Sequence, residues 1–257
     1  MKLINEFNYY LELLTELRLE LGSLPNGSLV KIRNATYCHK INGKYTGITN
    51  DPEMIGDLAR KKLLMILIRH IEYNISLMKK NLMLFPGKNP LLDSKNFKSI
   101  HPKDIIKSLS KSYQGLNESY FYHPSAIKWL AEISRQNDYK KELLTYKSKG
   151  GRFFRSRGEQ SFANLLEDNG LPYKSDVELV LGGIAKFPDF IVLNPFLGKI
   201  VVFEFFGLAD QSGYDEQMNK KMDWYRMNGC NAIYLFESDM RDSQRLQNLI
   251  DEKIWGI

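Results

Sequence analysis

The sequence predicts an α/β protein of two parts, a mostly helical N-terminal region and a C-terminal region whose mixed central sheet is flanked by helices. Two observations predict this class. Apolar residues at helical spacing dominate the first part, whereas from residue 156 onward helix-like and strand-like patterns follow in the order αβββαβα. A chain of 257 residues with 43% hydrophobic residues is long enough to bury a core in each part.

The N-terminal part begins with an amphipathic stripe over 4–21, where apolar residues recur at spacings of three and four. Short runs rich in Val, Ile, Tyr and Thr over about 24–49 then predict a small three-stranded sheet, and the Asn-Gly pair at 42–43 is a strong hairpin signal. The segment 50–52, Asn-Asp-Pro, supplies the cap and the first turn of a long helix that continues to about Leu84.

The middle of the chain has weaker patterns. Residues 85–103 contain three prolines among scattered polar residues, which predicts a loop. Helices are expected near 103–112 and over 124–144.

The segment 140–157 marks a change in composition, because it contains seven Lys or Arg residues and a single acid. Its glycine pair at 150–151 indicates a flexible joint. We therefore expect the domain boundary here, with an N-terminal domain over 1–147 and a C-terminal domain over 148–257.

Two basic surfaces are candidates for binding nucleic acid. Bases interleaved with aromatic residues beside a joint suit a phosphate backbone, although a solvated linker has the same composition. The predicted N-terminal sheet could also follow phosphates, or it could be a packing or dimerisation element that makes the chain a homodimer. The whole chain has 36 Lys and Arg against 30 Asp and Glu, which suits a polyanionic partner such as DNA without requiring one. The candidate contacts are Lys147, Lys149, Arg152, Arg155 and Arg157 in the basic segment, and Lys31 and Arg33 in the sheet.

The composition also predicts the compartment. Cys38 and Cys230 are too few for a disulfide scaffold and too far apart to suggest a metal site, so a reducing setting is expected. The longest apolar run, at 63–68, is far shorter than the roughly 20 residues that span a bilayer, so no membrane association is expected. Without a signal-peptide pattern at the start, we expect a cytoplasmic protein.

The C-terminal part is expected to contain regular elements from its first helix to its last. That first helix is bounded by Ser156 as its cap and Gly170 as its end. The expected elements that follow are strands at 177–181, 187–193 and 199–206, a helix over about 211–228, a strand at 231–237 and a helix over 243–255.

Two carboxylates are expected to meet on the hairpin formed by the second and third of these strands. If Asn194 pairs with Lys199 across the turn, the register places Asp189 directly opposite Glu204 on one face. Two such anions destabilise each other unless a cation lies between them. A divalent metal with oxygen ligands would relieve the repulsion.

The alternative is that the register slips, or that each acid pairs with a base such as Lys186 or Lys221. Lys221 lies with Tyr214, Met218 and Tyr225 on a stripe of the next helix that should face the sheet. A lysine on such a stripe usually extends its ammonium to water. Directed instead at Asp189 and Glu204, Lys221 could orient a water or stabilise charge on a phosphate.

Glu159 is a third candidate acid, because it shares the inward stripe of the first C-terminal helix with apolar residues. A local role competes with a role in the site. Ser156 and Glu159 fit a capping box, in which the glutamate returns to the cap's own amide. The two roles are compatible.

At these residues the chain resembles a known family. The αβββαβ order, with "PDF" and, one hairpin later, an acid in "FEFFG", resembles the PD-(D/E)XK nuclease superfamily, which has the restriction-endonuclease-like fold. More narrowly, the chain is similar to phage and bacterial proteins with an N-terminal "LP.GSL" hairpin and a core of the form "RS.SE", "PDF", "WEHFG" and "Y…K…Y…G". The stretches here read "LPNGSLVKI", "RSRGEQ", "FPDF", "FEFFGLAD" and "YDEQMNKKMDWYRMNG". The resemblance covers most of the chain and is strongest over 155–237.

The resemblance implies a metal-dependent DNA endonuclease. Asp189 and Glu204 would bind Mg²⁺ (or Mn²⁺), Glu159 would support the metal or its waters, and the product would be a broken phosphodiester bond. The superfamily's usual lysine follows the acid by two residues, where this chain has Phe206, and Lys221 is our candidate for a migrated replacement. The alternatives are a catalytically inactive nucleic-acid-binding protein with the same fold, or a structural subunit of a phage or mobile-element complex.

Overall fold

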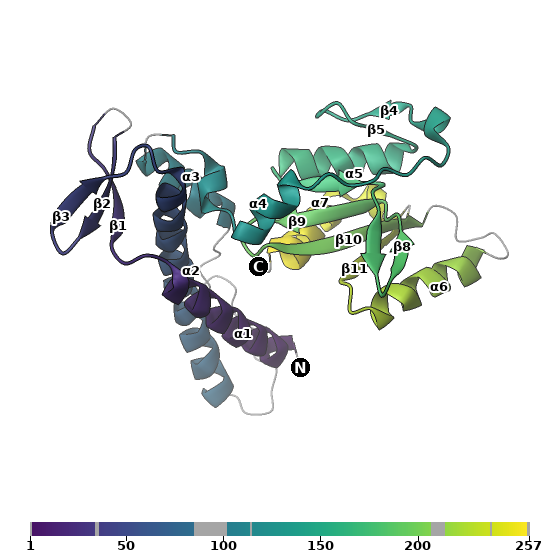
Figure 1. Ribbon diagram of the computed structural model, residues 1–257. Helices are drawn as coiled ribbons and strands as arrows, with labels where there is room; N and C mark the ends of the chain where they lie inside the picture. Colours follow the sequence, from purple (N-terminus) through teal and green to yellow (C-terminus); the bar gives the residue numbers. More distant parts are fainter. Residues whose placement is uncertain are drawn as a thin grey trace. The chain divides into compact units, whose positions relative to one another are not determined.

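The computed structural model shows a mixed α/β chain made of two compact units, Met1–Tyr122 and His123–Ile257 (Figure 1). The residues that the structure describes are 2–33, 36–84, 102–113, 115–206, 214–236 and 238–255.

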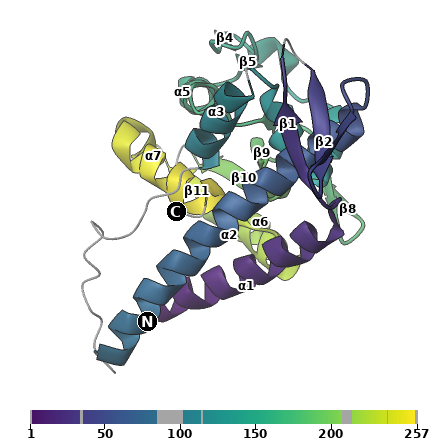
Figure 2. The ribbon, with the colours of Figure 1, turned by 90° about the vertical axis from the view of Figure 1, so that its left-hand side faces the viewer.

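Two long helices form the core of the first unit. Helix α1 (Lys2–Ser23) lies along α2 (Pro52–Leu84), as Figure 2 shows. Both predicted helices are thus confirmed, and Asp51 caps α2 by accepting a hydrogen bond from the Met54 amide at 3.0 Å. The buried residues of this interface include Leu14, Leu17, Leu58, Ala59, Leu63 and Leu64.

The predicted three-stranded sheet is also confirmed. Strands β1 (Ser28–Lys31), β2 (Tyr37–Ile41) and β3 (Lys44–Gly47) pair antiparallel in the order β1-β2-β3. The turn between β2 and β3 has φ of 48° at Asn42 and 80° at Gly43, the conformation that an Asn-Gly pair adopts most readily.

A shorter helix completes the first unit. Helix α3 (Pro102–Ser112) and the 3₁₀ turn η2 (Glu118–Phe121) pack on α2, which confirms the helix predicted near 103–112. Most of the predicted loop at 85–103 lies outside the described residues. The buried Arg60 of α2 donates to both carboxylate oxygens of Glu20, at 2.7 and 2.8 Å, and to the carbonyl of Phe121 at 3.0 Å. This arginine joins three elements of the unit.

The second unit begins earlier than the predicted boundary between residues 147 and 148. The helix expected over 124–144 is wrong in length, because α4 (Pro124–Ala131) ends at Ala131. The chain beyond it extends along the second unit: the Glu178 amide donates to the carbonyl of Arg135, and the Asn137 amide to that of Asp176, both at 2.9 Å. These backbone bonds replace the helical ones and place this stretch in the second unit.

The basic segment forms a hairpin within the second unit. Strands β4 (Tyr146–Lys147) and β5 (Phe153–Phe154) pair antiparallel, so the predicted joint is an ordered turn. Glu167 of the following helix fixes this turn by accepting from the Ser148 hydroxyl at 2.8 Å and the Gly150 amide at 2.6 Å.

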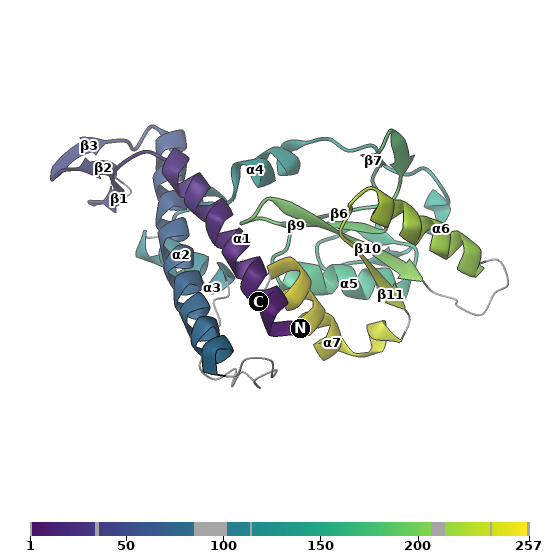
Figure 3. The same ribbon diagram turned by 90° about the horizontal axis from the view of Figure 1, so that it is seen from below.

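A mixed four-stranded sheet forms the centre of the second unit, in the order β11-β10-β9-β6. Strands β10 and β11 are parallel, and the other neighbouring pairs are antiparallel. Helices α5 and α6 lie on opposite sides of this sheet (Figures 1 and 3), and α7 lies beside α5. The bounds are α5 (Arg157–Asp168), β6 (Tyr173–Ser175), β9 (Phe190–Asn194), β10 (Lys199–Phe206), α6 (Tyr214–Met227), β11 (Ala232–Phe236) and α7 (Ser243–Ile250), with a π-helical turn over Asp251–Trp255.

The first strand of this sheet differs from the prediction. The stretch at 177–181 contains β7 (Leu179–Leu181), which pairs with β8 (Ile184–Lys186) in a separate two-stranded sheet. Gly182 and Gly183 have φ of 56° and 77°, which turns the chain back on itself before it reaches the central sheet. The edge position of the central sheet is taken by β6.

None of the helices within the described residues is both long enough and apolar enough to cross a membrane.

Candidate active site

The strand register brings two acids to the same end of the β9–β10 hairpin. Asn194 pairs with Lys199, as expected, and the antiparallel register continues without a slip through the rest of β9. Asp189 immediately precedes β9, so that this register places it opposite Glu204. The tight turn is fixed by Asn194 and by Gly198, whose φ is 64°.

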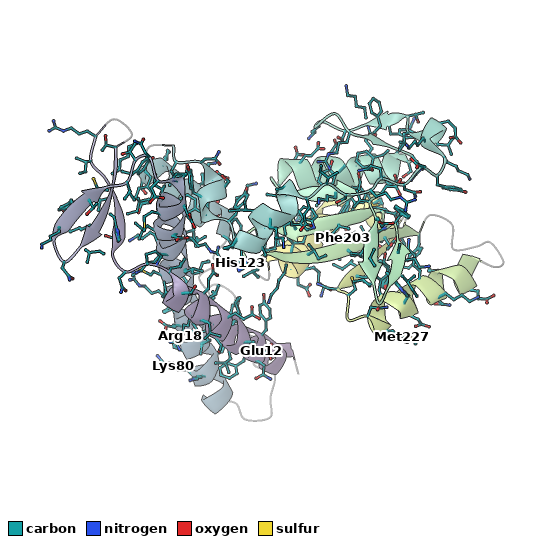
Figure 4. All side chains as sticks on the ribbon, in the orientation of Figure 1. Glu12, Arg18, Lys80, His123, Phe203 and Met227 are labelled. Atoms are coloured by element: carbon teal, nitrogen blue, oxygen red, sulfur yellow. The ribbon has the colours of Figure 1, made fainter. Side chains whose placement is uncertain are left out.

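The two faces of β10 have different neighbours. The rings of Phe203 and Phe205 lie 4.9 and 5.4 Å from the ring of Phe162 in α5, so these residues face that helix (Figure 4 labels Phe203). Side chains alternate along a strand, and Glu204 therefore points to the opposite face, toward α6. Its side chain is 1% exposed.

Two residues of α6 bind the carboxylate of Glu204. The ammonium of Lys221 donates to Oε2 at 2.6 Å, and the hydroxyl of Tyr225 donates to Oε1 at 2.5 Å. The two donors are four residues apart, which places them one above the other on the same helix face. The predicted alternative of a lysine partner is thus realised for Glu204, whereas Lys186 lies over the ring of Trp224 at 5.8 Å.

The protonation of this carboxylate is strongly perturbed. Burial, followed by the charge of Asp189, raises the pKa of Glu204 to about 7, although Lys221 and Tyr225 lower it. Burial and the charge of Glu204 raise the pKa of Tyr225. Asp189 is thus close enough to act on Glu204 electrostatically.

The charge of Asp189 acts on both other acids. It is half-buried, and its Oδ2 accepts a hydrogen bond from the amide of Phe205 at 2.7 Å. After burial, its charge is the largest contribution that raises the pKa of Glu159. Asp189 therefore interacts with both glutamates.

Glu159 takes part in the cap of α5. The hydroxyl of Ser156 donates to Oε1 of Glu159 at 3.0 Å and accepts from the Glu159 amide at 3.1 Å. The return bond of the capping box comes from the amide of Arg155, at 3.2 Å, instead of that of the cap residue. Glu159 combines this local role with a position beside Asp189.

Aromatic rings surround the side chain of Phe206. Phe206 follows Glu204 by two residues and faces the same side of β10. Its ring lies 5.7 Å from that of Tyr234 and 6.0 Å from that of Phe236, both on β11. The ammonium that reaches Glu204 comes from Lys221 on α6 instead.

Several predicted nucleic-acid contacts are engaged within the protein. Lys149 pairs with Asp168 at 2.6 Å, and Arg155 pairs with Asp176 at 2.5 Å. Arg152 donates to the carbonyl of Tyr173 at 2.8 Å and lies over its ring. These cations have structural roles.

The remaining predicted contacts differ in exposure. Lys31 donates to the carbonyl of Tyr113 at 3.2 Å. Arg33, Lys147 and Arg157 are exposed, and the ammonium of Lys147 lies over the exposed ring of Phe153. Lys149 and Arg152 are exposed as well, although they have partners within the protein, so these five cations and Phe153 are the part of the predicted set that faces solvent.

Tyr225 is the site residue that sequence reasoning missed. The stripe on α6 predicted that Tyr225 and Lys221 face the sheet, but not that both would bind one carboxylate. The signal was present, since a tyrosine one turn after the candidate lysine reaches the same target.

Comparisons with protein-family models, with curated proteins and with solved structures find no match to this chain. Among the described residues, no group of three or more His, Cys, Asp or Glu is arranged to hold a metal ion.

Proposed function

We propose that the chain is a metal-dependent endonuclease of the PD-(D/E)XK superfamily, with a restriction-endonuclease-like core, that hydrolyses phosphodiester bonds of DNA. One observation carries this proposal. Glu204 is buried on a central strand beside Asp189, with the ammonium of Lys221 on one of its oxygens. The order of the elements in and around the central sheet supports the proposal. These elements are α5, β6, β9, β10, α6 and β11, which follow the αβββαβ pattern of that fold.

Asp189 and Glu204 have the chemistry to hold Mg²⁺ (or Mn²⁺). Mg²⁺ is commonly bound by one or two carboxylates, and waters and phosphate oxygens complete its coordination. Two acids are therefore enough to bind the ion, and a group of three ligating side chains, which is not found among the described residues, is not required. Burial and, after it, the charge of Asp189 raise the pKa of Glu204, and a divalent cation would relieve the repulsion between the two acids.

The residues have complementary roles in the proposed reaction. When bound, the ion supplies positive charge to the scissile phosphate and makes a water more acidic. Glu159, beside Asp189, accepts hydrogen bonds and can orient water. Lys221 carries an ammonium that can stabilise the charge that develops on the phosphate.

The exposed cations supply the proposed DNA contact. Arg33, Lys147 and Arg157 are available to phosphates, and the exposed ring of Phe153 provides a stacking surface beside Lys147. A single-stranded or unpaired region of DNA would use both features.

Cleavage assays test the proposal. We expect the protein with Mg²⁺ or Mn²⁺ to cut supercoiled plasmid or single-stranded DNA, and Asp189→Asn and Glu204→Gln to reduce the rate by about 100-fold or more. Glu216→Gln is the matched control, because Glu216 is an exposed acid of α6 that pairs with Lys220. The site is misassigned if both variants cut as well as the parent.

A second candidate function is supported by the aromatic cluster around Phe206, which fills the usual lysine position. In this alternative the protein binds nucleic acid without turnover, alone or as a subunit of a larger complex. DNA binding in gel-shift assays, without cleavage by any tested divalent ion, would favour it over the nuclease.

A further inference from the structure

Both oxygens of the Glu204 carboxylate already accept a hydrogen bond from a side chain of α6 in this structure. Lys221 occupies Oε2 and Tyr225 occupies Oε1, both at short distances. A divalent ion on either oxygen would crowd the donor already there, and on Oε2 it would also repel the ammonium of Lys221. One of the two donors is therefore expected to move. The structure indicates which one.

The two donors differ in their freedom to move. Tyr225 is 0% exposed, and its ring is held in the core between α6 and the sheet. Withdrawing its hydroxyl would leave a buried polar group without this bond, which is unfavourable. The side chain of Lys221 is 27% exposed, so its ammonium can move into water without such a penalty.

We infer that Tyr225 is a positioning residue that fixes Oε1 of Glu204, and that Lys221 and a divalent cation compete for Oε2. This inference rests on the proposed function, since it concerns the same metal site. The lysine acts as a resident cation that neutralises the buried acid until a metal arrives. Once displaced, its ammonium remains on the same helix face, where it is available to a phosphate.

Lysine acetylation by an N-hydroxysuccinimide ester measures this displacement in the intact protein. The ammonium of Lys221 must leave the buried carboxylate before the lysine can be acetylated. We expect saturating Ca²⁺ to increase the labelling rate of Lys221 about fivefold, the change expected when a weak ion pair is released. Mass spectrometry gives the ratio to Lys220, an exposed neighbour that pairs with Glu216 and should not respond.

Two variants show whether the response comes from this geometry. Asp189→Asn removes a proposed metal ligand without touching Lys221, so it should abolish the response. Tyr225→Phe frees Oε1 for the ion, so Ca²⁺ should still bind while the increase at Lys221 falls by at least about half. An undiminished increase in Tyr225→Phe would contradict the positioning role.

Calorimetry of Ca²⁺ binding, done in parallel, separates failure of this inference from failure of the proposed function. Ca²⁺ binding that depends on Asp189 and Glu204 but leaves the labelling of Lys221 unchanged overturns the competition and leaves the metal site in place. If no Ca²⁺ binds to the parent protein, or if binding is unaffected by either acid, the metal site itself fails and the inference fails with it.

Discussion

At the residue scale, Glu204 combines deep burial with a charge that the fold must neutralise. A buried carboxylate is costly unless it is paired and hydrogen-bonded, and α6 supplies both a cation and a hydroxyl. Burial, followed by the charge of the neighbouring Asp189, keeps the pKa of Glu204 raised despite these partners. A buried carboxylate with a raised pKa adds little to stability, and such residues are typical of functional sites.

The raised pKa predicts how stability depends on pH. Glu204 has a folded pKa of about 7 against an ordinary value of 4.5, so the folded state binds the proton more tightly. Its contribution to the free energy of unfolding is complete below about pH 4.5 and is lost as the pH rises through about 7, a change of about 3 kcal/mol.

Urea unfolding without divalent metal, at pH 4.5 and pH 8, checks this prediction. The stability of Glu204→Gln relative to the parent should rise by about 3 kcal/mol between these values. Glu216→Gln, which changes an exposed acid of α6, should show a nearly constant difference. A constant difference for Glu204→Gln would show that this carboxylate does not titrate abnormally.

At the element scale, the β9–β10 hairpin shows what the sequence could predict. The turn residues Asn194 and Gly198 fix the register, and the period of two then places Asp189 opposite Glu204. The stripe on α6 predicted that Lys221 faces the sheet. These are local or periodic signals, which a single sequence carries.

Other elements could not be predicted, for identifiable reasons. Strand β6 has only three residues and gains its place through pairing with β9, a contact distant in sequence. The run at 177–181 has a stronger strand pattern, but the glycines at 182 and 183 turn it into a separate hairpin. The length of α4 was overestimated because backbone bonds of Arg135 and Asn137 to a later segment replace its last turns.

The β4–β5 hairpin gives a prediction at the same scale. Glu167 accepts hydrogen bonds from Ser148, Gly150 and Tyr173. Burial raises the pKa of Glu167, but these bonds lower it by more, so that the pKa lies below its ordinary value. We expect Glu167→Ala to lower the free energy of unfolding by about 2 kcal/mol, because a charged acceptor with three donors is lost.

Chemical denaturation measures this effect, with Asp168→Ala as the matched control. Asp168 is the adjacent acid on α5 and pairs with Lys149 on the surface, so its removal should cost less than about 1 kcal/mol. Equal effects of the two substitutions would mean that Glu167 does not anchor the hairpin.

At the scale of the whole molecule, the division between Tyr122 and His123 predicts which fragment folds. Residues 123–147 bind the second unit through several contacts, among them the ammonium of Lys174, which donates to the carbonyl of Glu132 at 3.0 Å. A fragment of residues 123–257 should therefore unfold cooperatively by itself. A fragment of residues 148–257 should be less stable by at least about 2 kcal/mol, because it loses these hydrogen bonds.

Circular dichroism during urea titration of the two fragments checks the boundary. Equal midpoints and slopes for both would show that residues 123–147 add nothing to the second unit, and that the boundary expected from composition is the better one.

The proposed function requires that Asp189 and Glu204 together hold a divalent ion. Anomalous diffraction from crystals grown with Mn²⁺ tests it most directly. We expect an anomalous peak beside both carboxylates, with Tyr225 still on Oε1 of Glu204 and Lys221 moved away from Oε2. Crystals saturated with Mn²⁺ in which no ion bridges the two acids, and in which Lys221 stays on Glu204, would contradict it.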